Sequence, residues 1–156
     1  MSEEEDSVTL NVSESGISLQ KLLAQAIKSE IEAAKTYRNL LDKNLPERAR
    51  PKVKRLVTQE EEHEEKLRTI FEDFFPDEEI PLPERSGVEV PSEIARKGSP
   101  REIIEKAMET ERESEKFYSE LIGEFDDRDV RRLLGYLAAN EREHYEILKV
   151  EREKLE

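Results

Sequence analysis

The chain has 156 residues, which is enough for one domain with one hydrophobic core. Charged residues make up 42% of it and apolar residues 35%, but the apolar residues recur at helical spacing, which argues against disorder. The formal net charge of −13 excludes the basic footprint of a nucleic-acid-binding protein, and no apolar run is long enough to span a membrane.

Cysteine is absent from the chain. This excludes disulfides, a thiolate nucleophile, an iron–sulfur cluster and any cysteine-ligated metal site. Residues 1–6 are acidic, which is the opposite of the basic start of a secretory signal. We therefore expect a cytoplasmic protein.

Residues 1–16 are acidic and serine-rich, and they show no helical period. We expect a flexible tail here, in which residues 8–12 could pair as a short strand. The remainder, 17–156, is expected to form one bundle domain. Apolar residues spaced three and four apart predict four amphipathic helices, at about residues 18–43, 46–75, 99–124 and 127–155.

The helix boundaries carry recognisable signals. Pro46 occupies a first-turn position at the start of the second predicted helix. Ser99, Pro100 and Glu102 form a predicted capping box at the start of the third, and Asp126 or Asp127 caps the fourth. Residues 76–98 hold four prolines and are expected to be a long connector, which crosses back along the bundle between the second and third helices.

The chain repeats a set of four residues at an offset of 81 positions. The repeated residues are Glu30, Tyr37, Glu60 and His63 in the first half, and Glu111, Tyr118, Glu141 and His144 in the second. The two histidines are the only ones in the chain, and each follows a glutamate by three positions. The fold predicted from the repeat is all-α, a four-helix bundle built from two duplicated helical hairpins.

The four repeated glutamates and both histidines interrupt the apolar stripes of their helices. Glu30, for example, lies between Ile27 and Ala33, and Glu111 lies between Met108 and Ser114. Buried, unpaired carboxylates cost several kcal/mol or take a raised pKa. Two divalent cations would balance four carboxylates, and oxygen and imidazole donors without sulfur suit iron or manganese, and zinc less selectively. The pattern predicts a buried two-metal site.

A glutamate on a helix usually lies at the surface, and many glutamates here fit that interpretation. Those expected at the surface are Glu61, Glu62, Glu64, Glu65, Glu113, Glu143 and Glu146. Glu115, one turn past Glu111 at the edge of the stripe, is expected at the surface, with an additional carboxylate of the site as the alternative. Tyr37 and Tyr118 lie two turns beyond Glu30 and Glu111 on the same helix faces. They are expected to be core aromatics, hydrogen-bond donors to a metal-binding carboxylate, or both.

With these residues the chain resembles the rubrerythrin branch of the ferritin-like di-iron carboxylate superfamily, over about residues 18–155. The resemblance implies one terminal glutamate and one histidine for each of two iron ions, with two bridging glutamates between them. The terminal glutamates would be Glu30 and Glu111, the bridging ones Glu60 and Glu141, and the histidine ligands His63 and His144. Manganese or zinc could take the place of iron.

The chain departs from the usual rubrerythrin in two respects. It lacks the cysteines of a rubredoxin domain, so electrons would come from an external donor. Where rubrerythrins tend to carry an additional glutamate, three residues beyond the third-helix ligand, the chain has Ser114. The six-residue set is closer to a bacterioferritin-like site.

The expected function is that of a di-iron protein reacting with O₂ or hydrogen peroxide, as a peroxidase or a ferroxidase. The alternatives are an iron-binding or storage module of a larger assembly, and a metal-free helical interaction protein. We expect a homo-oligomer without nucleic-acid or membrane partners.

Overall fold

The computed structural model describes residues 18–84 and 92–155. The predicted tail at residues 1–16, with its possible strand, lies outside the described residues. All regular elements in the described ranges are helices, which confirms the predicted fold class. No helix in this part of the chain is long and apolar enough to cross a membrane.

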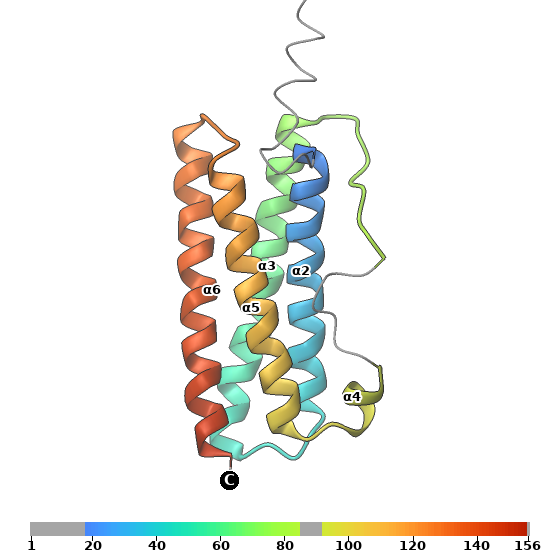
Figure 1. The fold of residues 1–156 in the computed structure, drawn as a ribbon, viewed down its shortest axis with the longest axis vertical. Coiled ribbons are helices and arrows are strands. Elements are labelled where there is room, and N and C mark those ends of the chain that lie inside the picture. Colours follow the sequence, from blue (N-terminus) through green and yellow to red (C-terminus); the bar gives the residue numbers. More distant parts are fainter. Residues whose placement is uncertain (1–17, 85–91, 156) are drawn as a thin grey trace, which may run out of the picture.

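Four long helices form the bundle, and two shorter helical segments lie between them. The elements are α2 at Leu19–Leu41, a 3₁₀ turn at Glu47–Ala49, α3 at Arg50–Phe74, α4 at Ser92–Lys97, α5 at Pro100–Ile122 and α6 at Arg128–Lys154. The helices α2 and α3 form one antiparallel hairpin, and α5 and α6 form the other (Figure 1).

Side-chain caps define the starts of three long helices. The Ser18 hydroxyl accepts a hydrogen bond from the Lys21 amide at the start of α2, a cap that the sequence pattern did not predict. Ser99 and Glu102 form the predicted capping box of α5. Asp127, and not Asp126, caps α6 through hydrogen bonds from two backbone amides. These side chains satisfy amides that have no partner within the first helical turn.

The second helix begins later than predicted. Pro46 has an extended backbone, with φ −57° and ψ 141°, and a 3₁₀ turn follows it. The α-helix starts at Arg50. Pro51 then falls in the first turn, where its missing N–H leaves no helical hydrogen bond unmade. The predicted start of this helix at Pro46 was therefore too early by one short turn, because Pro46 and Pro51 are both compatible with the start of a helix.

The predicted connector at 76–98 contains the short helix α4. Its first turn carries Glu93 and its last turn Arg96 and Lys97, a distribution that favours a helix through its dipole. Gly98 ends it with a hydrogen bond from its amide to the Ile94 carbonyl oxygen. A Cβ atom at Gly98 would lie 2.4 Å from that oxygen, so this close approach requires glycine.

The ends of the connector lie at opposite ends of the bundle, as a crossover requires. The helix α3 ends at the upper end in Figure 1, whereas α4 and the start of α5 lie at the lower end. The two hairpins pack mainly through α2 against α5, while α3 and α6 contact each other little. The result is a bundle whose central helices are α2 and α5.

The hydrophobic core has two layers. One is built around Leu23, Phe71 and Leu134, and the other around Leu40, Leu56 and Ile104. On α2, Ile27 belongs to the first layer and Ala33 to the second. Glu30, between them, is therefore enclosed by apolar side chains from both ends of the bundle.

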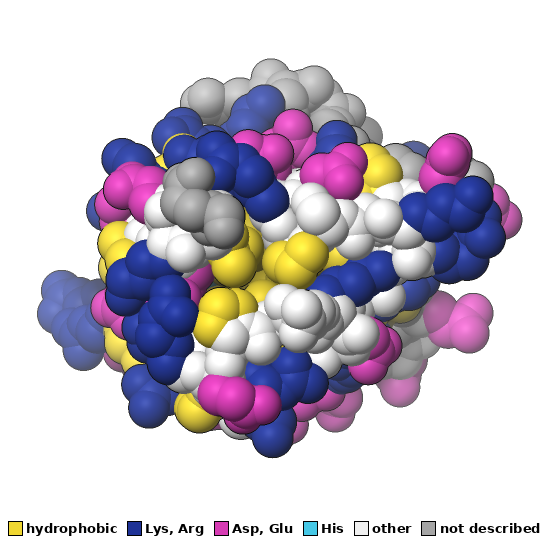
Figure 2. All heavy atoms as spheres, turned by 90° about the horizontal axis from the view of Figure 1, so that it is seen from below, with side chains coloured by type: hydrophobic (Ala, Val, Ile, Leu, Met, Phe, Trp, Pro, Cys, Tyr) yellow, Lys and Arg dark blue, Asp and Glu magenta, His cyan; other side chains and the backbone are white. Residues whose placement is uncertain are grey.

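The lower end of the bundle exposes a small hydrophobic patch (Figure 2). Figure 2 shows the lower end of the bundle, where a patch of hydrophobic side chains lies among charged side chains of both signs. The chain as a whole has a formal net charge of −13.

Candidate metal centre

Each of the four long helices contributes to one buried polar cluster at the level between the two apolar layers. Glu30 comes from α2, Glu60 and His63 from α3, Glu111 from α5, and Glu141 and His144 from α6. All six side chains are buried. The structure thus brings together every residue that the sequence pattern predicted for the site.

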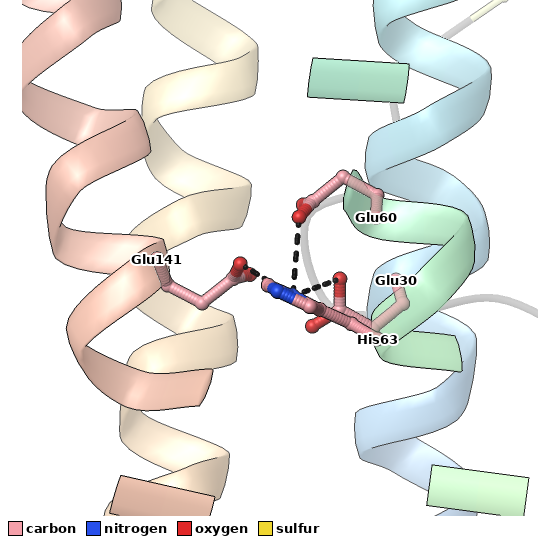
Figure 3. A group of neighbouring side chains, drawn as sticks. All are labelled: Glu30, Glu60, His63 and Glu141. Carbon is pink, nitrogen blue, oxygen red and sulfur yellow. Dashed lines mark ion pairs between the residues drawn. The ribbon is translucent and has the colours of Figure 1, made fainter. Parts of the chain in front are cut away.

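The six residues form two overlapping groups that could each hold a metal ion. Within a group, one ligand atom from every residue lies within 4.8 Å of the others. One group is Glu30, Glu60, His63 and Glu141 (Figure 3), and the other is Glu60, Glu111, Glu141 and His144. Glu60 and Glu141 belong to both groups, which is the geometry that a bridging carboxylate requires.

The two histidines face the carboxylates in the same way. His63 Nδ1 lies 3.0 Å from Glu141 Oε1, 3.3 Å from Glu60 Oε1 and 3.6 Å from Glu30 Oε1. His144 Nδ1 lies 3.1 Å from Glu60 Oε1 and 3.5 Å from both Glu111 Oε2 and Glu141 Oε1. The two rings are nearly parallel, with centroids 5.8 Å apart and planes inclined by 7°.

Most of the side-chain oxygen and nitrogen atoms of the cluster lack hydrogen-bond partners. Apart from Gln20 Oε1, the buried side-chain atoms without a partner in the described ranges all belong to the six residues. They include both oxygens of Glu60, both oxygens of Glu141 and Nδ1 of each histidine. Buried polar atoms without partners are costly, and metal coordination would satisfy all of these at once. The residues therefore fit a pair of cations.

The electrostatics of the cluster support this interpretation. Burial raises the pKa of Glu60 well above its usual value, and the charges of Glu111, Glu141 and Glu30 raise it further. The pKa of Glu141 is raised by burial first, and then by the charges of Glu111 and Glu30. Without cations, the cluster can keep its charge low only by holding protons.

The two buried tyrosines connect the hairpins. The Tyr37 hydroxyl donates a hydrogen bond to Glu111 Oε1, and the Tyr118 hydroxyl donates one to Glu30 Oε2. Each tyrosine therefore contacts a glutamate of the opposite hairpin. Burial, followed by the charges of nearby glutamates, raises the pKa of both hydroxyls, so the tyrosines remain protonated donors.

One contact to the cluster was not predicted from the sequence. Gln59 Oε1 lies 2.8 Å from His144 Nε2. Gln59 immediately precedes the first Glu-x-x-His segment, and its place in the sequence next to Glu60 could have identified it. Metal-binding histidines commonly donate their second ring N–H to such a partner.

Two other residues lie outside the cluster. Glu115 pairs with Arg142 at 2.5 Å, in agreement with the surface position expected for it. Ser114, at the position where rubrerythrins tend to carry a glutamate, shares a 2.5 Å hydrogen bond with Ser29 in the contact between α2 and α5. Neither supplies a further donor atom to the two groups.

A four-helix bundle with overlapping carboxylate–histidine groups at its centre defines the class of ferritin-like proteins, which hold metal pairs between their helices. The family model described as Rubrerythrin matches residues 21–151, and the chain belongs to this family. The rubrerythrin family is one of di-iron carboxylate proteins, and the buried groups found here could hold metal.

One solved structure and one curated protein are similar to this chain in sequence. A hypothetical protein from Pyrococcus furiosus is 30% identical, with a TM-score of 0.76 over 90% of this chain and 91% of that one. An uncharacterized protein from Archaeoglobus fulgidus is 46% identical over 50 residues, which are 32% of this chain and 78% of that protein.

Two more distant structures share the fold alone. CopM in its Cu(II)-bound form is 12% identical, with a TM-score of 0.74 over 88% of this chain and 97% of that one. An uncharacterized conserved protein from Magnetospirillum magnetotacticum MS-1 is 23% identical, with a TM-score of 0.62 over 88% of this chain and 95% of that one.

Proposed function

We propose that the protein is a di-iron oxidoreductase that reacts with O₂ or hydrogen peroxide, as a peroxidase or a ferroxidase. The observation that carries the proposal is the set of buried donor atoms without partners, contributed by four glutamates and two histidines. A ferrous pair held by these residues would supply two electrons, which with two protons convert one hydrogen peroxide to two waters, or one O₂ to one hydrogen peroxide. An external donor then returns the electrons.

The ligand roles follow from the two overlapping groups. Glu60 and Glu141 would bridge the ions because they belong to both groups. Glu30 and His63 would complete one position, named here the Glu30/His63 position. Glu111 and His144 would complete the other, the Glu111/His144 position.

The charge of this ligand set suits two divalent ions. Four carboxylates offset four positive charges, and the imidazoles bind in their neutral form. The sum is zero, so the ions can be held between two apolar layers without a net buried charge. Oxygen and nitrogen donors without sulfur suit iron and manganese, and zinc less selectively.

The surrounding residues hold the geometry. Tyr37 and Tyr118 fix one oxygen of Glu111 and one of Glu30, which leaves Glu111 Oε2 and Glu30 Oε1 free for a metal. The apolar layers on either side limit the access of water, which protects the reaction from side products. These are the contributions that a protein makes to metal-based oxidation.

Stopped-flow spectroscopy on anaerobically Fe(II)-loaded protein tests this function. We expect rapid oxidation of the bound iron by hydrogen peroxide or O₂ in the unaltered protein, and slow oxidation in Glu141→Gln. The substitution Glu143→Gln is the control, because Glu143 is exposed on the same helix. Oxidation no faster in the unaltered protein than in Glu141→Gln would refute an oxidative role. Repeated turnover of added Fe(II), or of peroxide with a separate reductant, distinguishes ferroxidase from peroxidase.

A further inference from the structure

The two halves of the metal centre differ outside the ligands. The residue before the first Glu-x-x-His segment is Gln59, and the residue at the same place in the second segment is Asn140. Gln59 reaches across to His144 of the other hairpin at 2.8 Å. The Asn140 side chain instead donates a hydrogen bond to the Tyr136 carbonyl oxygen of its own helix at 3.0 Å.

Gln59 determines which nitrogen of His144 carries the proton. An amide oxygen can only accept a hydrogen bond, so His144 Nε2 must donate to Gln59 Oε1. The lone pair of Nδ1 then faces Glu60, Glu111 and Glu141, at 3.1 to 3.5 Å. A lone pair directed at carboxylate oxygens is arranged for a cation between them.

His63 lacks such a partner. No hydrogen bond to its Nε2 is found among residues 18–84 and 92–155, and its side chain is 4% exposed, against 0% for His144. Asparagine is one methylene shorter than glutamine, so Asn140 bonds within its helix and does not reach across as Gln59 does. No side chain in the described residues therefore fixes the tautomer of His63 through its Nε2.

We propose that Gln59 makes the two metal positions unequal, so that the Glu111/His144 position binds its ion first and more tightly than the Glu30/His63 position. Gln59 is a positioning residue that acts through His144. Partners of this kind typically change metal affinity by about 10- to 100-fold. The inference rests on the proposed two-metal site.

Three substitutions isolate the effect of Gln59. Gln59→Leu removes the acceptor and keeps a similar volume. Asn140→Leu is the matched control in the other half, because the Asn140 side chain donates its hydrogen bond within its own helix. Asn140→Gln adds the missing methylene and should supply His63 with a partner.

Anaerobic calorimetric titration with Fe(II) measures the two binding steps in each variant. We expect Gln59→Leu to weaken the tighter step by about 10- to 100-fold, with Asn140→Leu unchanged. We expect Asn140→Gln to tighten the weaker step. Comparison among variants is required, because the charge of the first ion alone separates the two steps in every variant.

The nuclear magnetic resonance spectrum of ¹⁵N-labelled histidine identifies the position that fills first, because the chain has only two histidines. With Zn(II) as a diamagnetic probe, the His144 ring should shift at the first equivalent and the His63 ring at the second. In Gln59→Leu this order should be lost. A general loss of folding would weaken both shifts, and would not by itself remove the difference in order between the two rings.

The outcomes are distinct. Fewer than two Fe(II) ions per unaltered chain would remove the proposed function itself. If the unaltered chain binds two ions, and the tighter step is no weaker in Gln59→Leu than in Asn140→Leu, Gln59 does not have the proposed role. The proposal would also be overturned if the His63 ring, and not the His144 ring, shifted at the first equivalent of Zn(II) in the unaltered protein. Should Gln59→Leu fail to fold, the Asn140→Gln titration still decides, since an unchanged weaker step contradicts the proposal.

Discussion

The Tyr118 hydroxyl on α5 donates a hydrogen bond to the Glu30 carboxylate on α2, and neither side chain is exposed. The relationship joins the two hairpins at the level of the metal centre, and Tyr37 and Glu111 repeat it in the opposite direction. The tyrosines therefore both fill the core and donate to the carboxylates, a combination that the sequence allowed.

Replacement of Tyr118 by phenylalanine should leave Glu30 Oε2 buried without a partner. We expect a loss of about 1 to 3 kcal/mol in the free energy of unfolding of the metal-free protein, because an unsatisfied buried acceptor costs that much. Denaturant unfolding in the presence of a chelator measures it. Tyr136→Phe is the control, since Tyr136 is 60% exposed. Equal effects of the two substitutions would mean that the Tyr118 hydrogen bond contributes nothing.

Loss of a bridging carboxylate should abolish binding of the second ion. Glu60→Gln and Glu141→Gln each remove a residue shared by both groups, whereas Glu61→Gln and Glu143→Gln alter exposed neighbours. We expect fewer than two bound metal ions for the first two variants and two for the others. Metal analysis after dialysis gives the ratio. If the exposed neighbours reduced binding as much, the assignment of Glu60 and Glu141 as bridges would be wrong.

The metal-free protein should lose stability as pH rises. The pKa values of Glu60 and Glu141 are raised in the folded state, so the folded state holds protons that the unfolded state releases. Their contribution to stability is then full below the unfolded pKa, about 4.3, and is lost as pH rises from there through the raised folded values.

Melting temperatures measured with and without chelator, from mildly acidic to neutral pH, check this dependence. The metal-loaded protein should show no such decline, because the cations offset the carboxylate charge, and it should melt higher by mass action. Strong acid will in time protonate the ligands and release the metal. Parallel curves with and without metal would mean that these carboxylates do not share one buried site.

The cap of α6 offers a test of the fold independent of the metal. Asp127→Ala should lower the free energy of unfolding by about 1 kcal/mol, because the Asp127 side chain accepts hydrogen bonds from two amides of the first turn. Denaturant unfolding of the metal-loaded protein measures the change. Asp126→Ala is the matched control, since Asp126 is an exposed neighbour outside this cap. A larger loss of stability for Asp126→Ala than for Asp127→Ala would mean that Asp127 is not the cap of α6.

Helical periodicity was sufficient to predict the long helices and the burial of all six cluster residues, because a polar residue within an apolar stripe must face the core. The capping box of Ser99 and Glu102 could also be predicted, because capping depends on residues that are close together in the sequence. The start of α3 could not be predicted correctly, because Pro46 and Pro51 are both compatible with the first turn of a helix.

Contacts between the hairpins were harder to predict. The sequence did not indicate which carboxylate would accept a hydrogen bond from Tyr37, and its hydroxyl reaches Glu111 of the other hairpin. Gln59 gave no periodic signal because it is half-buried at the edge of its stripe. Such contacts depend on how the helices cross, which a pattern within one helix does not contain.

The central claim is that four glutamates and two histidines form one site for two metal ions. Anaerobic titration with Fe(II), monitored by calorimetry and by iron analysis after removal of unbound metal, tests it most directly. We predict saturation at about two ions per chain, the number that balances four carboxylates. Saturation at one ion, or no binding, would contradict the account and leave only the helical bundle standing.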